Sequence, residues 1–271
     1  MRQRARLYPA VAAGGFRRYA TYGTATAAGV FTNTVFGLIV AYAYLALWEE
    51  RPGLGGYDRA QALTFVWVSQ ALIAAVALIG GGFQEELQER VRTGDIAVDL
   101  YRPADLQLWW LAADLGRAAF QLMGRGVVPL LVGALVFPLA LPSDPARWAL
   151  FLVSVFLGLV VSFAIRYLLG LSAFWLMDGS GVNLMAAVVS TFFSGVLLPL
   201  TLFPGGFGEV VRLLPWAAML QTPLDVLLGT HEGAGAALPA LGFQAAWALL
   251  LLGAGRWAQA AATRRVVVQG G

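Results

Sequence analysis

Few residues in this sequence have the type and spacing that covalent or metal chemistry needs. His231 is the single histidine and cysteine is absent, and one histidine without cysteine makes a poor metal site. There is no G-x-S-x-G nucleophile elbow, and the stretches GGGFQ and GEVVRLLPW lack the strand that precedes a phosphate-binding loop. We therefore predict no catalytic residue, no metal site and no cofactor in this chain.

The basic residues are all arginines, because the sequence contains no lysine. A Walker A site places a lysine on the phosphates of its nucleotide. The protein is therefore not a P-loop ATPase, and any ATP and Mg that it depends on must bind to another subunit.

The composition is that of a membrane protein. Of the 271 residues, 59% are hydrophobic and 12% are charged, against about 25% charged residues in soluble domains. Apolar runs of about 20 residues suit spanning helices and lack the alternation of a membrane barrel. We predict an all-α integral membrane protein. The net charge of +3 comes from arginines near helix ends, which indicates lipid contact rather than nucleic-acid binding.

Six transmembrane helices are predicted. They cover residues 21–48, 60–82, a segment that ends at 141 after a bend near Gly124, Gly126 or Pro129, then 148–176, 182–202 and 238–260. A helix over 103–141 would be about 57 Å long at 1.5 Å per residue. This exceeds a bilayer, so its first part should lie at the membrane interface. Residues 1–20, with arginines between apolar and aromatic residues, predict an N-terminal interfacial helix.

Residues 83–103 form the only long charged stretch between two apolar segments. Phe83, Leu87 and Val91 recur every four residues, so they should form the apolar face of an amphipathic helix that Gly94 ends. Asp95 then either caps a second short helix or begins an extended strip. Arginines concentrate here and near both chain ends, which places these three regions in the cytoplasm by the positive-inside rule.

A stripe of polar residues at helical spacing runs through the third span. The polar stripe consists of Gln107, Asp114, Arg117, Gln121 and Arg125. We interpret it as the solvent-facing side of an interfacial helix in preference to a substrate surface, because charges in lipid are costly.

Two more polar residues lie in apolar segments. Asn33 is expected to bond a neighbouring helix. Arg166 should face protein, water or a headgroup, with an acid such as Asp178 or a backbone carbonyl as its partner. With the polar stripe these residues supply the candidates for a substrate path, namely Asn33, Arg117, Gln121, Arg125 and Arg166.

Residues 203–229 are apolar yet repeatedly broken by glycine and proline. This pattern predicts short re-entrant helices on the external side, which are tolerated only where they pack on protein or line a wet cavity. The residues assigned to this external cap are Pro199, Pro204, Pro215, Trp216 and Pro223.

Three motifs resemble those of ABC-2-type transporter permeases, in the six-span branch that includes viologen-exporter-like and daunorubicin-resistance-like proteins. They are RTGDIAVDLYRP after the second span, SGVLLPLTLFP followed by LLPWAAMLQTPLDVLLG, and the terminal VVVQGG. The resemblance covers residues 1–271 as one transmembrane domain. It implies a coupling helix that docks on a separate cytoplasmic ATPase dimer, through Phe83, Glu86, Leu87, Arg90, Val91, Gly94 and Asp95.

The resemblance also implies a second permease subunit, either another copy or a paralogue, in a bacterial inner membrane. The function we expect is that of a non-catalytic permease in an ATP-driven exporter, of the kind that includes multidrug efflux systems. Its cargo would be an amphipathic or lipid-like compound. Two alternatives stay open: a membrane-embedded lipid-modifying enzyme that holds a headgroup with Arg117, Arg125 and Arg166, and a secondary transporter. No internal repeat of the kind seen in secondary transporters is evident.

Overall fold

The computed structural model describes residues 2–77, 82–176, 179–230 and 237–264, and all regular structure among them is helical. Five helices in these ranges are long and apolar enough to cross a membrane: Gly23–Glu50, Arg59–Val76, Leu106–Val136, Pro145–Phe174 and Ala237–Thr263. These are α2, α3, the α6–α7 pair, α8 with its last short turn, and α12. The prediction of an all-α membrane protein is confirmed.

The fifth predicted span, 182–202, is shorter than expected. Its helix, α9, covers Ser180–Phe193, which is 14 residues or about 21 Å at 1.5 Å per residue. The hydrocarbon layer is about 30 Å thick. The helix ends because Gly195 has a φ of +92° and because Pro199 follows shortly, and neither continues a helix.

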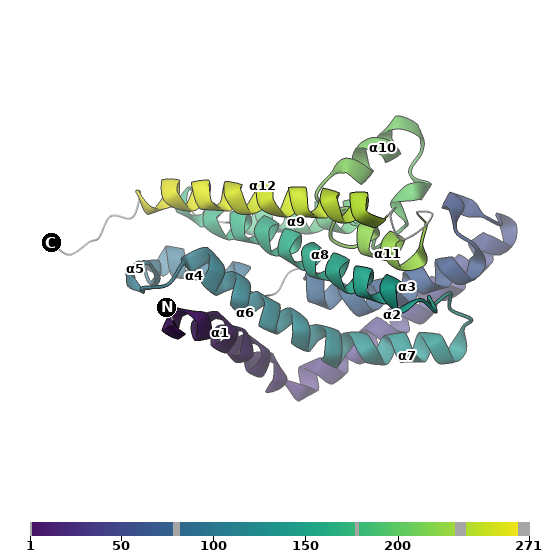
Figure 1. Ribbon diagram of the computed structural model, residues 1–271, viewed down its shortest axis with the longest axis horizontal. Helices are drawn as coiled ribbons and strands as arrows, with labels where there is room; N and C mark the ends of the chain where they lie inside the picture. Colours follow the sequence, from purple (N-terminus) through teal and green to yellow (C-terminus); the bar gives the residue numbers. More distant parts are fainter. Residues whose placement is uncertain (1, 78–81, 177–178, 231–236, 265–271) are drawn as a thin grey trace.

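The helices run roughly along one axis and divide the short elements between its two ends (Figure 1). At one end lie α4 (Gln84–Thr93), α5 (Ile96–Tyr101), the start of α1 (Arg2–Ala20) and the last turns of α12. At the other end lie α10 (Gly205–Leu213) and α11 (Gln221–Leu228), beside the loop between α2 and α3. The charged stretch and the N-terminal helix therefore share one end, and the glycine- and proline-rich stretch forms the other.

Helix α3 is the central helix of the bundle. It begins with a capping box, in which the Asp58 carboxylate accepts from the Gln61 backbone N–H and the Gln61 side chain accepts from the Asp58 N–H. Trp67 in its middle is fully buried. A Cβ at Gly37 of α2 or at Gly133 of α7 would contact the Trp67 ring. Glycine at these two positions lets α2 and α7 pack against the indole from either side.

The predicted bend in the third span is present. Helix α6 (Leu106–Gln121) passes through a π-helical turn, Leu122–Gly126, into α7 (Val127–Val136). A Cβ at Gly126 would lie 2.6 Å from the Ala71 carbonyl oxygen, so this glycine permits the turn to approach α3 closely. A π-helical turn is one of the identifiable causes of a helix kink.

Helices α8 (Pro145–Leu171) and α12 (Ala237–Thr263) pack side by side along the opposite side of the bundle (Figure 1). The Asp144 carboxylate caps α8 and Pro145 occupies its first turn. In the interior, Ser154 Oγ donates to Gln244 Oε1 at 2.7 Å, and Gln244 Nε2 donates to the carbonyls of Ser154 and Ala218. This amide joins α8, α12 and the turn that precedes α11.

Candidate functional site

The polar stripe of α6 faces the protein interior and not solvent. Asp114 is 4% exposed, Arg117 is 3% exposed and Arg166 of α8 is 5% exposed. The interpretation of the stripe as a wet surface is therefore wrong. Periodicity showed that these side chains share a face, but α1, α3 and α8 cover that face, and no sequence pattern indicates this.

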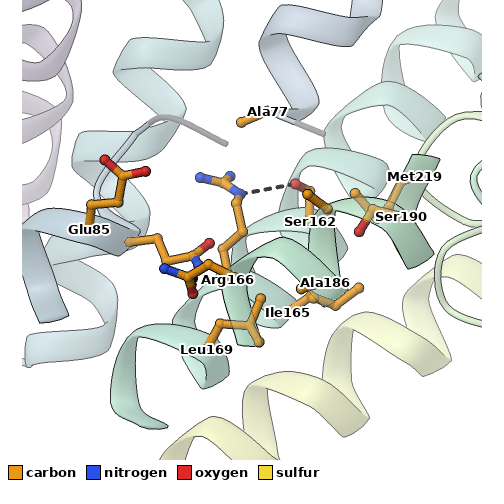
Figure 2. A pocket seen from close by; sticks show the side chains of 12 residues that line it. Ala77, Glu85, Ser162, Ile165, Arg166, Leu169, Ala186, Ser190 and Met219 are labelled. Carbon is orange, nitrogen blue, oxygen red and sulfur yellow. Dashed lines mark hydrogen bonds between the residues drawn. The ribbon is translucent and has the colours of Figure 1, made fainter. Parts of the chain in front are cut away.

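Arg166 borders a small pocket between α8, α9 and the start of α4 (Figure 2). The pocket has a volume of about 50 Å³ and is also lined by Ser162, Gln84, Asn183 and Ser190. Ligand pockets commonly measure about 300–1,000 Å³. This pocket suits water molecules, so we do not assign it to a transported compound.

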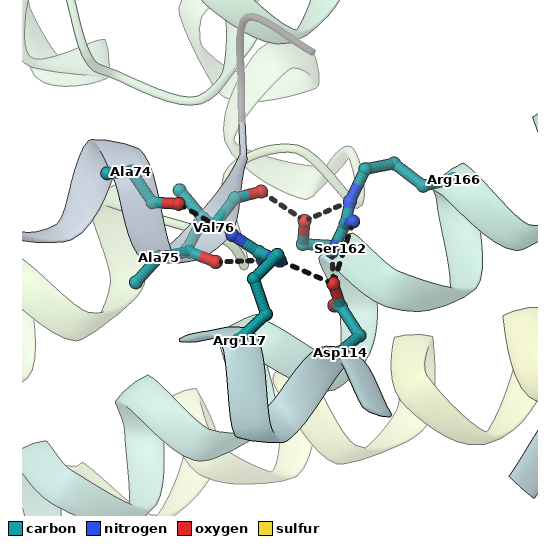
Figure 3. A network of polar contacts seen from close by, with 7 residues as sticks. All are labelled: Ala74, Ala75, Val76, Asp114, Arg117, Ser162 and Arg166. Atoms are coloured by element: carbon teal, nitrogen blue, oxygen red, sulfur yellow. Dashed lines mark hydrogen bonds and ion pairs between the residues drawn. The ribbon is translucent and has the colours of Figure 1, made fainter. Parts of the chain in front are cut away.

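Arg166, Arg117 and Asp114 form a closed ionic network (Figure 3). The two terminal nitrogens of Arg166 donate to the Asp114 carboxylate oxygens at 3.1 and 2.5 Å. Arg117 Nε donates to the same carboxylate at 2.6 Å. Arg166 Nε also donates to Ser162 Oγ at 3.2 Å. Every member is buried, so each charge depends on these partners instead of water.

The network also caps the C-terminal end of α3. Arg117 donates to the carbonyls of Ala74 and Ala75 at 2.8 and 2.6 Å, and the Ser162 hydroxyl donates to the Val76 carbonyl at 2.5 Å. The last carbonyls of a helix lack partners within it and carry about half a negative charge. Two arginines against one aspartate leave one surplus positive charge, which this helix end partly balances.

The network touches the predicted coupling segment through Phe83. The Arg166 guanidinium lies 5.2 Å from the centre of the Phe83 ring, a cation–π contact. Gly82 comes just before it with a φ of +90°, and a Cβ there would lie 3.0 Å from Arg166 Nη1. Position 82 therefore needs glycine for its backbone conformation, and the network leaves little space for a side chain.

The apolar face of the coupling segment is turned into the protein, which contradicts its assignment as a docking face. Phe83 is 5% exposed and packs on Trp110 and Phe163. Leu87 is fully buried against Gly170 of α8, and Val91 is partly buried in the same cluster. A helix that lies on its own bundle buries its apolar stripe there, so a partner can only meet the opposite face.

An amide cluster joins the coupling segment to α9. Gln84 Nε2 and Gln88 Nε2 donate to Asn183 Oδ1 at 2.6 and 3.0 Å, and Asn183 Nδ2 donates to Gln88 Oε1 at 2.8 Å. Gln88 Nε2 also lies 3.1 Å from the carbonyl of Leu169 in α8. These bonds tie α4 to the end of α8 and to the start of α9.

Several charged residues of the segment form ion pairs. Glu86 accepts from Arg18 of α1 at 2.7 Å. Arg90 forms a fork with the buried Asp99 carboxylate at 2.5 and 2.9 Å, and this hydrogen bond raises the pKa of Arg90 above its ordinary value. Arg102 lies 3.1 Å from the same carboxylate. The Arg90–Asp99 pair holds α5 against α4.

Gly94 and Asp95 stand at the turn between α4 and α5. Gly94 ends α4 with a φ of +83°, as predicted. A short helix follows Asp95, so the helical alternative is right and the extended strip is wrong. The Asp95 carboxylate does not cap α5, because it accepts from the Thr93 hydroxyl at 3.1 Å.

The other candidate path residues lie nearer α2. Asn33 Nδ2 donates to the Gln70 carbonyl of α3 at 3.4 Å, which is the helix-to-helix bond expected for it. Arg125, in the π-helical turn, lies against Gly29 of α2, and its buried Nε has no hydrogen-bond partner among the described residues. Gln121 is buried and its Oε1 is also without a partner there. Asn33 and Arg125 thus contact α3 and α2, and none of the hydrogen bonds of the Arg117–Arg166 network involves them.

The predicted external cap forms a second polar network. Tyr57 donates to Asp225 Oδ1 at 2.6 Å, and Gln221 Nε2 donates to the Tyr57 hydroxyl at 2.9 Å. Gln221 Oε1 accepts from the Leu200 N–H at 2.8 Å. Burial raises the pKa of Tyr57 above its ordinary value, and the Asp225 carboxylate raises it further.

The cap residues named from the sequence shape this end. Pro199 and Pro204 precede short helices, Pro215 opens the turn that leads to α11, and Pro223 is buried in the first turn of α11. Trp216 packs 6.3 Å from the Phe193 ring. Residues 203–229 contain the predicted short helices, and of these α11 packs on α8 and α3.

Sequence reasoning missed several residues of these networks. The residues that were not assigned to any site are Asp114, Ser162, Gln84, Gln88, Asn183, Tyr57, Gln221 and Asp225. For Asp114 a usable signal exists, because it is an acid three residues before Arg117 in an apolar run. His231 and Asp178 lie outside the described residues. Within the described ranges no group of three or more histidine, cysteine or acidic residues could hold a metal ion.

Comparison with known proteins adds one finding. The sequence model of a family described as "ABC-2 family transporter protein" matches residues 31–270. That range contains all the networks above except Arg18 of α1. A search among curated proteins found no match to this chain.

Proposed function

Since the chain belongs to the ABC-2 family of transporter proteins, and is thus a membrane component of an ABC transporter, we propose that it is the permease subunit of an ATP-driven exporter. Its cargo is an amphipathic or lipid-like compound taken from the cytoplasm or the inner leaflet. ATP and Mg bind to a separate ATPase dimer. The observation that carries the proposal is the α4–α5 segment, which has one face buried in the bundle and the other exposed at its end.

The ATPase meets the exposed face of this segment. Val98 is 59% exposed and Tyr101 is 80% exposed, so α5 offers two large side chains at the tip of the molecule. Exposed charged residues lie on α4 and in the turn that follows it, namely Glu85, Glu89, Arg92 and Asp95. An aromatic anchor with a charged rim is a common composition for a protein interface.

Motion of α4 passes into the bundle through its buried face. Leu87 fits against Gly170 of α8, the Gln84–Gln88–Asn183 cluster holds α9, and Phe83 lies on Arg166. A rigid displacement of α4 therefore moves α8 and α9 with it, because packed interiors transmit shifts instead of absorbing them. This supports a coupling role for the segment.

A second permease subunit, the same chain or a paralogue, completes the transporter in the bacterial inner membrane, with both termini in the cytoplasm. Helices α2 and α9 leave most of their surface free of contacts within the chain. They suit the contact with that subunit. Arg125 lies against Gly29 of α2 and its Nε has no partner among the described residues, so it is the basic side chain we expect to meet cargo.

The test is copurification of the protein from its native membrane with an ABC ATPase subunit. Tyr101→Asp and Val98→Asp should abolish copurification and leave thermal stability unchanged, because exposed substitutions usually alter stability by about 0.5 kcal/mol or less. Leu213→Asp, at a residue that is 65% exposed at the opposite end, is the matched control. Undiminished ATPase capture by both variants would refute the docking face. Turnover of a lipid by the isolated chain would favour an enzyme instead.

A further inference from the structure

A second and larger cavity, of about 560 Å³, lies where α1, α4, α5 and α6 meet. Its volume falls in the range of about 300–1,000 Å³ that is usual for ligand sites. None of the residues that line it belongs to the Arg117–Arg166 network. One of its walls is apolar and the other is charged.

The apolar wall comes from Leu7 and Val11 of α1 and from Trp109, Trp110 and Ala113 of α6. Helix α1 is held closely against α6, because a Cβ at Gly15 would overlap the Ala113 carbonyl and one at Gly116 would overlap the Ala12 carbonyl. Close backbone contact of this kind fixes the distance between the two helices. The contact between α1 and α6 therefore fixes the shape of the apolar wall.

The charged wall carries one surplus positive charge. Its members are Arg18, Glu86, Arg90, Asp99 and Arg102, three arginines against two acids. Arg18 pairs with Glu86, and Arg90 forks onto Asp99 at 2.5 and 2.9 Å. Arg102 is a second cation on a carboxylate that is already paired. Because Asp99 is already paired with Arg90, we assign the surplus charge to Arg102. The Arg102 guanidinium lies 5.2 Å from the centre of the Trp109 ring.

The positions of its tryptophans indicate that the cavity lies near the membrane surface. Trp109 and Trp110 are in the first turns of the candidate span Leu106–Val136, and tryptophans at the ends of spans commonly lie among lipid headgroups. Arginine binds phosphate through paired N–H donors. A soluble phosphate would leave the apolar wall in water, whereas a lipid would cover it.

We propose that this cavity binds an anionic phospholipid of the leaflet on the α4–α5 side. The phosphate is held by Arg102, and the glycerol and upper acyl chains cover Leu7, Val11 and Trp110. The inference goes beyond the proposed export function. Binding belongs to this chain alone, so it is measured without the ATPase and its outcome is separate from the docking test.

The experiment is native mass spectrometry of the purified full chain titrated with phosphatidylglycerol, phosphatidylcholine or glycerol 3-phosphate. Phosphatidylglycerol should bind saturably and the other two should not. Arg102→Gln should weaken its binding roughly tenfold or more, because a hydrogen bond to a charged group contributes about 1.5–3 kcal/mol. Arg59→Gln removes the same charge at an exposed residue beyond the opposite end of the bundle and should bind like the parent.

A second variant fills the cavity. Gly14 lines it, and a Cβ there meets no atom within 4 Å, so the side chain of Gly14→Trp starts in open space, occupies the cavity and should also weaken binding. Gly242→Trp on α12, where a Cβ is equally unobstructed, is its control. Arg102→Gln and Gly14→Trp alter opposite walls of the cavity, so if one of them misfolds the other still tests the proposal.

Three results would overturn the proposal. Equal binding of phosphatidylcholine would remove the anionic requirement. Competition by glycerol 3-phosphate at matched concentration would identify a soluble phosphate as the ligand. Parent-like binding of phosphatidylglycerol by folded Arg102→Gln and Gly14→Trp would place the lipid elsewhere.

Discussion

Replacing Asp114 with asparagine tests the ionic network most directly. The change keeps the shape of the side chain but leaves Arg117 and Arg166 buried with no counter-ion, since both bond the same carboxylate. Removing one partner of a buried ion pair costs about 3–5 kcal/mol. At about 2–4 °C per kcal/mol for a chain of this size, the midpoint of thermal unfolding should fall by roughly 6 to 20 °C.

Thermal unfolding of the detergent-solubilised protein, followed by tryptophan fluorescence, measures this loss. Glu49→Gln is the control, because the Glu49 and Arg59 side chains are 63% and 56% exposed and 3.3 Å apart. An exposed pair of this kind contributes about 1 kcal/mol at most. The control should therefore shift the midpoint by only a few degrees.

Arg166→Met tests whether the loss of stability comes from an unpaired buried charge or from a general loss of contacts. It leaves Asp114 paired with Arg117, so it should destabilise less than Asp114→Asn. The double variant should be more stable than the sum of the two single effects predicts, because it removes a charge that Asp114→Asn leaves unpaired. The reasoning is refuted if Asp114→Asn behaves like Glu49→Gln, or if the two single effects simply add.

Three further predictions follow from other parts of the bundle. Leu87→Ala should destabilise the protein by about 2–5 kcal/mol, because Leu87 is fully buried and its loss leaves a cavity; a variant with parent-like thermal stability would show that α4 does not pack as described. Gly133→Val should lower the unfolding midpoint, because a side chain there contacts the Trp67 ring, whereas Gly253→Val on α12, where a Cβ meets no atom within 4 Å, should have little effect. Tyr57→Phe should lower the free energy of unfolding by about 1–3 kcal/mol at neutral pH, because it leaves buried polar groups unpaired. The pKa of Tyr57 is raised above its ordinary value of 10.0, so the stability that this group contributes is complete below pH 10 and is lost as the pH rises further. The difference between the variant and the parent, measured by urea unfolding, should therefore stay constant below pH 10 and shrink above it.

Much of the architecture follows from the order of residues in the chain. Runs of apolar residues about as long as a bilayer is thick require helices, because backbone groups in lipid have no other partners. The glycines and prolines that interrupt 122–129 and 203–229 predicted a bend and short helices, and both are present. Gly94 ended α4 for the same local reason. Each of these inferences depends on neighbours within a few residues, which the sequence shows directly.

The sequence by itself thus determined a helical membrane protein with an amphipathic segment at 83–94 and a polar face on α6. Only the tertiary structure decided where those faces point. The same four-residue spacing fits a helix that docks on a partner and one that lies on its own bundle, and Phe83 and Leu87 do the latter. Asp114 and Arg166 are 52 residues apart in the chain, so their pairing depends on the packing of α6 against α8. Local periodicity defines a face, but the element that covers it is chosen by contacts between distant parts of the chain.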